Sequence, residues 1–276
     1  SSNQLNDAVS SAKIAQKKWE KVGIEKRANI LNDIGSEIIK QSKEIGTLLS
    51  REEGKTLPEG IGEVVRSGQQ FQYYAASALR QFGENIASTR EGVSVEMTRE
   101  PVGVCGIISP WNFPIAIAAW KAAPAMAFGN AVVLKPASQT PASAIALTKI
   151  ISDQKDIPEG LFNLVLGGGG TIGHQISGHP DIDAISFTGS VSVGQTIYME
   201  AAKTMKKMQL EMGSKNPLLV MDDADLDIAV ACATNGAYGG TGQKCTASSR
   251  LIVHEKVYKD FIKRLITGIS ALKVGH

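Results

Sequence analysis

The first 80 residues carry apolar side chains three and four positions apart, the spacing that places them on one face of a helix. The clearest examples are Val9, Ala12, Ala15 and Trp19, then Ile30, Ile34 and Ile38, then Val64, Phe71 and Leu79. The pattern predicts three amphipathic helices, with breaks near Gly54 and Pro58. From Gly92 the apolar residues alternate with polar ones, which predicts an exposed antiparallel strand or arm.

After residue 101 the chain alternates short apolar segments with helical ones. The apolar segments predict strands at 102–108, 131–134, 162–166 and 182–187. The segments that follow them predict helices at 115–128, 142–151, 171–177 and 191–204. Short, fully apolar strands separated by helices of this length require right-handed crossovers and a parallel sheet covered on both faces. We therefore expect an α/β fold with a doubly wound, Rossmann-like parallel sheet.

The last part of the chain continues the alternation on a smaller scale. It predicts strands at 218–221 and 250–254 and helices at 226–238 and 257–272. Four elements are too few to form a complete second core. The sequence thus predicts two domains. Residues 1–213 form a helical lead-in followed by the doubly wound domain, and residues 214–276 begin a second α/β domain.

Composition excludes several classes of protein. The chain has 276 residues, 43% of them hydrophobic, which is enough for a substantial core and excludes general disorder. Its 29 basic and 27 acidic residues leave a net charge of +2 without a dense basic run, so we expect no nucleic-acid partner. The long uncharged stretch at 101–120 is interrupted by Pro110, Asn112 and Pro114, so we expect no membrane span.

The three cysteines, Cys105, Cys232 and Cys245, form no close pair. They supply neither a disulfide framework nor the spacing of a zinc site, which favours a reducing, cytoplasmic compartment. The four histidines form no ligand cluster, and we expect no metal.

The loops that follow the strands are the candidate sites, because ligands of a doubly wound sheet bind beyond the carboxyl ends of its strands. In the loop 109–114, two prolines frame Asn112. The Asn112 amide could donate a hydrogen bond to a developing oxyanion, or it could cap the following helix. In the loop 135–138, Lys135 could reach a ribose or phosphate, although solvated lysines are common at strand ends.

Glycine-rich segments follow the next two strands, at 167–173 and 188–194. Glycines between a strand and a helix let backbone N–H groups approach a pyrophosphate at the positive helix end, although such turns also serve tight geometry alone. Neither segment fits the usual dinucleotide fingerprint, with its acidic residue about 20 positions further on. Their occurrence at successive strand ends favours a nucleotide site.

Two further residues carry candidate chemistry. Cys245 ends the glycine-rich segment 239–245 beside Lys244, which could lower the pKa of the thiol and favour a thiolate. The alternative is that Cys245 is a small buried hydrophobe, as lone cysteines commonly are. Glu211 stands among apolar residues, where it could be a base with a raised pKa or a paired structural charge.

Together these loops resemble, in order and separation, those of the NAD(P)-dependent aldehyde dehydrogenase superfamily. The matching segments are Pro110-Trp111-Asn112-Phe113-Pro114, Lys135-Pro136, Phe187-Thr188-Gly189-Ser190 with Gly194, Glu211-Met212-Gly213 with Lys215-Asn216-Pro217, and Gly242-Gln243-Lys244-Cys245. The resemblance covers essentially the whole chain. Residues 211–217 and 239–250 are most similar to bacterial 2-oxoglutarate-semialdehyde (2,5-dioxopentanoate) dehydrogenases.

The resemblance implies an oxidoreductase that converts an aldehyde to a carboxylate, with 1–213 containing the NAD(P)-binding domain and 214–276 the start of the catalytic domain. Cys245 would attack the aldehyde, and the Asn112 amide and the Cys245 N–H would hold the oxyanion of the thiohemiacetal. Hydride transfer to the nicotinamide would leave a thioester, and Glu211 would activate the water that hydrolyses it. The residues expected to contact NAD or NADP are Ile108, Ser109, Pro110, Trp111, Lys135, Ser138, Gly173, Phe187, Thr188, Gly189, Ser190, Val193, Met212 and Gly213.

Departures from the family pattern refine these expectations. Many NAD-preferring relatives have Glu at the position of Ser138, so we expect NADP to be accepted here. The commoner Glu-Leu-Gly-Gly is replaced by Glu211-Met212-Gly213-Ser214. Family members extend beyond both ends of this chain, so we expect it to be incomplete and inactive by itself. In the intact protein we expect a homodimer or homotetramer.

Two alternatives stay open at the level of sequence. The chain could be a truncated, catalytically silent nucleotide-binding fragment, in which the motifs persist without a complete site. It could also be a coenzyme A-acylating relative, although the presence of Glu211 favours hydrolysis.

Overall fold

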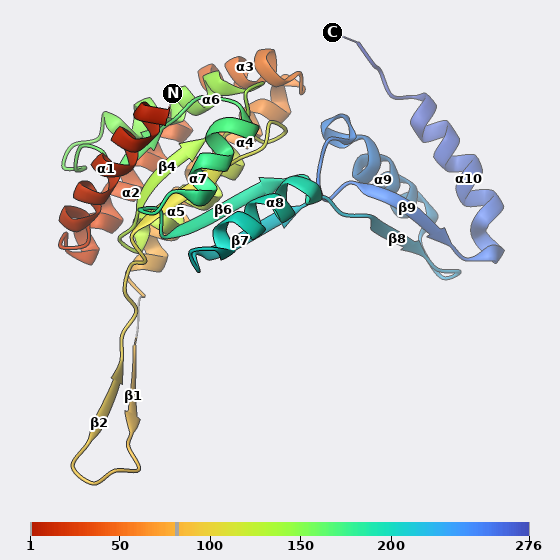
Figure 1. Cartoon of the computed structure of the whole chain (residues 1–276). Coiled ribbons are helices and arrows are strands. Elements are labelled where there is room, and N and C mark those ends of the chain that lie inside the picture. The colour runs from red at the N-terminus through yellow and green to blue at the C-terminus, as the bar shows by residue number, and fades with distance from the viewer. Residues whose placement is uncertain (1, 81–82, 276) are drawn as a thin grey trace. The chain divides into compact units, whose positions relative to one another are not determined.

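The computed structural model describes residues 2–80 and 83–275, so Ser1 and His276, the outer ends of the two predicted domains, lie outside the described residues. The chain divides into two compact units, Ser1–Glu211 (unit 1) and Met212–His276 (unit 2). Figure 1 shows the helices and strands of both units.

Residues 2–80 form four helices where the sequence pattern predicts three: α1 Ser2–Trp19, α2 Ile24–Lys40, α3 Ser42–Glu53 and α4 Leu57–Ala78. Only Gln41 separates α2 from α3, and no Gly or Pro lies at the break. The apolar spacing therefore continues across it and predicts a single helix. Gly54 has φ 96° and ends α3, and a capping box between Thr56 and Glu59 begins α4. Helices α2 and α4 cross closely at Gly35 and Gly68, where an added Cβ would come within 2.6 Å of the opposite carbonyl oxygen.

An antiparallel hairpin follows the helices. Its strands are β1 Glu84–Ala87 and β2 Ser94–Met97, and every residue of both is exposed (Figure 1). The exposed antiparallel arm predicted from residue 93 onward is thus confirmed. Its partner strand β1 was not predicted, because only Ile86 and Ala87 interrupt a polar segment there.

Unit 1 is built on a five-stranded sheet with the order β5-β4-β3-β6-β7. The strands are β3 Val104–Ile108, β4 Ala131–Lys135, β5 Phe162–Leu164, β6 Ala184–Gly189 and β7 Lys207–Met212. β3 pairs in parallel with both β4 and β6, and β4 pairs in parallel with β5. Every residue of β4 is buried, so both faces of the sheet are covered at its centre. The predicted doubly wound sheet is confirmed, and its strand order reverses between β3 and β6.

The helices that connect these strands are α5 Ala116–Ala127, α6 Pro141–Ser152, α7 His174–Gly178 and α8 Val191–Ala202 (Figure 1). The short helix expected at 171–177 is a π-helical turn, Gly169–Gly173, followed by α7. The Trp19 indole N–H donates to the carbonyl of Met126 at 2.7 Å, which joins α1 to the end of α5.

Unit 2 pairs β8 Asn216–Val220 in parallel with β9 Ser248–Val253. Between the two strands lie α9 Leu226–Tyr238 and the short 3₁₀ turn Gly239–Gly242, and α10 Glu255–Ser270 follows β9. The buried residues of this unit are Val220, Ala233, Phe261 and Leu265. Along the described parts of the chain, no helix is both long enough and apolar enough to cross a membrane.

Candidate active site

A cavity of about 360 Å³ lies beyond the carboxyl end of β3, at the place where the strand order reverses. It is lined by Ile108, Gly169, Gly170, Gly173, His174, Ser177, Val193, Thr196 and Ile197. The predicted contact residues Ile108, Gly173 and Val193 therefore surround one space. The other lining side chains, His174, Ser177, Thr196 and Ile197, were not predicted from the sequence, and they lie one to four positions beyond Gly173 or Val193. An added Cβ at Gly169 or Gly170 would meet only open space, so bare backbone forms this part of the wall.

A larger cavity, about 680 Å³, lies beside the hairpin and is lined by residues that include Arg27, Glu84 and Pro101. Pro101 precedes β3, so this cavity is on the amino side of the sheet. None of the predicted site residues lines it. Ligands of doubly wound sheets bind at the carboxyl side, so we place the candidate site in the smaller cavity.

Lys135 and Ser138 meet at the carbonyl of Gly167. The Lys135 ammonium, on a residue only 3% exposed, donates to this oxygen at 3.2 Å and to the Pro136 carbonyl at 2.5 Å. Burial lowers the pKa of Lys135. The Ser138 hydroxyl donates to the same Gly167 oxygen at 3.3 Å. The loops after β4 and β5 are therefore joined next to the glycine-rich turn.

The end of β6 and the start of α8 also border the site. Phe187 is buried, and an added Cβ at Gly189 would come within 2.5 Å of its ring, so this turn requires glycine. Thr188 is half-buried. Ser190 caps α8, and its hydroxyl accepts from the Val193 amide at 3.4 Å. The positive end of α8 thus lies beside the cavity that Val193 lines.

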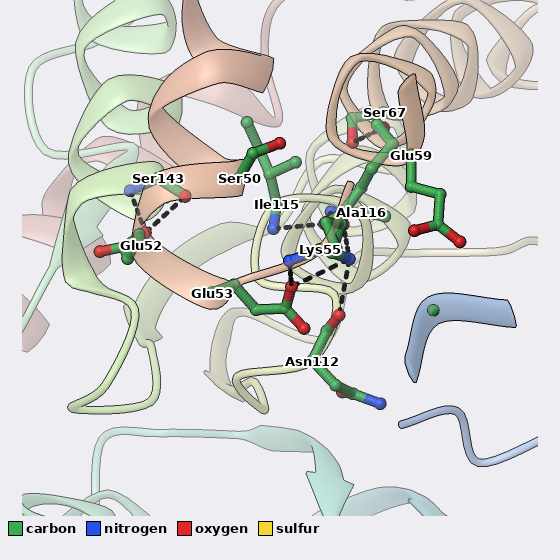
Figure 2. Close-up of polar contacts among 12 residues, drawn as sticks. Ser50, Glu52, Glu53, Lys55, Glu59, Ser67, Asn112, Ile115, Ala116 and Ser143 are labelled. Atoms are coloured by element: carbon green, nitrogen blue, oxygen red, sulfur yellow. Dashed lines mark hydrogen bonds and ion pairs between the residues drawn. The ribbon is translucent and has the colours of Figure 1, made fainter. Parts of the chain in front are cut away.

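The loop between β3 and α5 is fixed by hydrogen bonds that its backbone forms with Lys55 and Glu63. The Lys55 ammonium donates to the Asn112 carbonyl (Figure 2), with 2.8 Å between the two atoms. The Glu63 carboxylate accepts from the amides of Ile115 and Ala116 at 3.1 and 3.0 Å. Glu63 therefore caps the start of α5, the alternative role considered for Asn112. In the same loop, Ser109 is buried and its hydroxyl has no hydrogen-bond partner among the described residues. Pro110 is half-buried, and Trp111 is exposed.

Glu211 lies on the edge strand β7, exposed, at the end of a polar chain. Its carboxylate accepts from the Gln209 side-chain amide at 2.9 Å. The Gln209 carbonyl oxygen in turn accepts from the Lys121 ammonium at 2.8 Å and from the Ser186 hydroxyl. Glu211 is thus not enclosed by apolar side chains in unit 1. Lys121 was missed by the sequence analysis, although a lone cation within the apolar segment 115–128 is a signal for it.

We expect Lys121 to titrate near pH 8, because burial lowers the pKa of its ammonium to about 8 while the charge of Glu211 acts in the opposite direction. The Nζ resonance of Lys121 followed by NMR against pH should show this midpoint, and Lys121→Arg should remove the resonance. Glu211→Gln should lower the midpoint further. A midpoint near the ordinary value of 10.5 would contradict the burial of this amine.

Cys245 lies in unit 2 on the loop between the 3₁₀ turn and β9, and it is exposed. The side-chain amide of Asn216 donates to its carbonyl at 2.7 Å, and the Arg250 guanidinium donates twice to the Lys215 carbonyl, at 3.0 and 2.6 Å. Asn216, the first residue of β8, therefore holds the cysteine loop, and Arg250 of β9 holds the residue that precedes β8. The Lys244 side chain lies over the glycines, since an added Cβ at Gly239 would come within 2.8 Å of its Nζ.

The remaining predicted residues lie at the start of unit 2, where Met212 is half-buried and Gly213 is exposed. Lys135, Ser138, Gly173, Ser190 and Val193 come together in unit 1. Asn112 and Glu211 also belong to unit 1, on separate elements, and Cys245 belongs to unit 2. Within the described ranges, no group of three or more His, Cys, Asp or Glu side chains is placed to hold a metal ion.

A doubly wound sheet with a glycine-walled cavity at its switch point defines unit 1 as a Rossmann-like domain. The whole chain, residues 1–276, matches the model of the aldehyde dehydrogenase family. The chain belongs to this family, which confirms the resemblance seen in the sequence.

Named relatives agree with this assignment. The chain is 41% identical over 273 residues to an alpha-ketoglutarate semialdehyde dehydrogenase of Haloferax volcanii, covering 99% of this chain and 56% of that protein. It is 42% identical over 270 residues to an alpha-ketoglutaric semialdehyde dehydrogenase of Bacillus subtilis, covering 97% and 55%. The chain thus spans a little over half the length of these relatives.

Among solved structures, a point mutant of betaine aldehyde dehydrogenase from Staphylococcus aureus superimposes with a TM-score of 0.95 at 35% identity. The match covers 98% of this chain and 55% of the other. That structure is a complex with NAD⁺ and contains a BME-modified cysteine.

Proposed function

We propose that the intact protein containing this chain oxidises an aldehyde to a carboxylate, with NAD⁺ or NADP⁺ as hydride acceptor and Cys245 as nucleophile. The observation that carries the proposal is the glycine-walled cavity at the switch point of the sheet in a member of the aldehyde dehydrogenase family. The test is aldehyde-dependent formation of NADH or NADPH by the purified intact protein. Absence of reduction with every aldehyde and both cofactors would contradict it and would favour the silent nucleotide-binding alternative.

The residues of unit 1 fit a dinucleotide. The cavity volume falls in the range of about 300–1,000 Å³ that is usual for small-molecule sites, and its bare backbone at Gly169 and Gly170 admits close approach of a ligand. Lys135 and Ser138 would hold the adenosine ribose, and Ser190 with the first amides of α8 would hold the pyrophosphate. When bound, the nicotinamide supplies the acceptor for the hydride.

The reaction at the aldehyde carbon is carried out by residues of this chain. The Cys245 thiolate attacks the aldehyde carbon and forms a C–S bond, and the Asn112 amide and the Cys245 N–H donate to the resulting oxyanion. Loss of hydride from that carbon leaves a thioester on Sγ. Glu211 takes a proton from water, the hydroxide attacks the thioester, and the C–S bond breaks to release the carboxylate and return the thiolate. Because Glu211 can activate water, we propose hydrolysis and not transfer to coenzyme A.

The names of the two relatives indicate the substrate class. Both are named as dehydrogenases of alpha-ketoglutarate semialdehyde, an aldehyde that carries a 2-oxo acid group. We therefore propose 2-oxoglutarate semialdehyde as substrate. A panel of straight-chain aldehydes with and without a terminal carboxylate, compared by kcat/KM, tests this. A preference for the uncharged aldehydes would contradict it. We also propose a homodimer or homotetramer in the cytoplasm, a compartment that suits the free thiols of Cys105, Cys232 and Cys245.

We expect Ser138→Glu to weaken NADP⁺ binding by a factor of about ten, or about 1.4 kcal/mol. The exposed Ser138 hydroxyl lies beside Lys135 at the ribose end of the proposed site, where a carboxylate would repel a 2′-phosphate. Calorimetry with NADP⁺ and NAD⁺ measures the effect. The neighbouring exposed change Gln139→Glu adds the same charge and serves as the control. Equal NADP⁺ affinity in wild type and Ser138→Glu would show that the ribose end lies elsewhere.

A further inference from the structure

Lys55 and Glu63 form an ion pair inside unit 1, with 2.6 Å between Nζ and Oε2. Their side chains are 3% and 2% exposed. Lys55 lies in the turn between α3 and α4, and Glu63 lies on α4. The Lys55 ammonium is also 3.9 Å from Glu53 Oε2 and 4.0 Å from the centre of the Phe113 ring. The cation is therefore enclosed by protein groups.

A buried ion pair of this kind is weak evidence for a stabilising role. Removing two charges from water costs several kcal/mol per ion, so apolar residues of the same volume commonly give equal or greater stability. What distinguishes this pair is its set of backbone partners. Besides bonding each other, both side chains form hydrogen bonds to the backbone of the segment that leads from β3 into α5.

The pair holds that loop at two places. The Lys55 ammonium donates to the Asn112 carbonyl at 2.8 Å. Three residues further along, the second oxygen of Glu63 accepts from the Ile115 and Ala116 amides, at 3.1 and 3.0 Å. The backbone of Asn112 is thus connected to the start of α5 through one rigid, water-excluded unit. Its side-chain amide extends from the same residue (Figure 2).

We infer that Lys55 and Glu63 are positioning residues that set the location of the Asn112 amide for the oxyanion, without touching the substrate themselves. The inference rests on the proposed role of Asn112. An oxyanion donor acts only within a narrow distance of the developing charge. A displacement of about 1 Å at a reacting centre can cost on the order of a hundredfold in rate. The pair therefore costs stability in the folded protein but improves stabilisation of the oxyanion in the transition state.

The test is a double-mutant cycle in the intact protein. Lys55→Met keeps the aliphatic stem and removes the bond to Asn112, and we expect kcat to fall about 10- to 100-fold while KM for the cofactor stays within about threefold. In an Asn112→Ala background the same change should lower kcat by less than about threefold, because the amide it positions is already absent. An equal loss in both backgrounds would overturn the inference.

Glu52→Gln is the matched control. The Glu52 carboxylate caps α6 in the same manner, accepting from the amides of Ala142 and Ser143 at 2.5 and 3.0 Å, and it has no bond to the Asn112 loop. We expect it to lower stability with kcat within about threefold of wild type. A loss of kcat as large as that of Lys55→Met would assign both residues to general stability and overturn the inference.

Lys55→Met leaves Glu63 and Glu53 buried without their cation, and burial already raises the pKa of both carboxyls. Should that variant fail to fold, Lys55→Met combined with Glu63→Gln removes both charges and keeps an oxygen for the Ile115 and Ala116 amides. It is expected to show the same loss of kcat. Unfolding of this double variant as well would assign the pair to stability alone. If Asn112→Ala by itself leaves kcat unchanged, the proposed oxyanion role fails, and this inference fails with it.

Discussion

Replacing Cys245 with alanine in the intact protein is expected to lower kcat by about 10⁴-fold or more, because a chemical nucleophile cannot be replaced by binding energy. Cofactor binding should persist, since the cavity, Lys135, Ser138 and Ser190 all belong to unit 1 whereas Cys245 belongs to unit 2. Steady-state turnover and calorimetry with the cofactor measure the two effects separately.

The other two thiols provide controls. Cys105 lies on β3, where burial raises the pKa of its thiol to about 12, so it stays protonated and unreactive. Cys232 lies exposed on α9 and tests whether exposure alone explains reactivity. We expect iodoacetamide to label Cys245 before Cys232, and Cys232→Ala to retain activity. Turnover by Cys245→Ala within about tenfold of the wild-type rate, or labelling of Cys232 before Cys245, would contradict the assignment of Cys245 as nucleophile.

Glu211→Gln is expected to lower steady-state turnover by about 10²- to 10⁴-fold, the usual contribution of a general base. The loss should fall on hydrolysis, so the first turnover should still produce a burst of NADH or NADPH equal to the number of active sites. The amide can still accept from Gln209, so the polar chain to Lys121 stays in place.

Rapid-mixing measurements of cofactor reduction separate the burst from the steady state. Glu96→Gln, on the exposed strand β2 of the hairpin, removes one carboxylate of the same kind and should leave both phases unchanged. A Glu211→Gln variant whose burst and steady state fall together would show that Glu211 acts before the thioester forms.

The centre of the doubly wound core was predictable because its strands β3 and β4 are almost entirely apolar. Residues 131–134 are four consecutive apolar residues and form all but the last residue of β4. In unit 2, the helix predicted at 226–238 coincides with α9. β7 was missed for the opposite reason, since Lys207 to Met212 alternate in polarity and half of them are exposed at the sheet edge. The break at Gln41 was missed because no Gly or Pro interrupts the helical period there.

Some residues of the candidate site could likewise be predicted from the sequence, and others could not. Residues in glycine-rich loops at strand ends, such as Gly173 and Ser190, could be named because the topology fixes where strand ends lie. Lys55 and Glu63 could not, because their partners near Asn112 lie more than 50 residues away in sequence, and only the packing of α4 on α5 brings them together. Long-range polar contacts of this kind leave no local periodic signal.

The most direct test of the proposed mechanism is the covalent intermediate. Glu211→Gln protein mixed with cofactor and aldehyde, quenched in acid and digested, should yield a Cys245 peptide whose mass is increased by that of the aldehyde less two hydrogen atoms. Omission of the oxidised cofactor should prevent this acyl adduct from forming. A Cys245 peptide that stays unmodified while NADH or NADPH is produced, or an acyl group found on Cys105 or Cys232, would contradict the account.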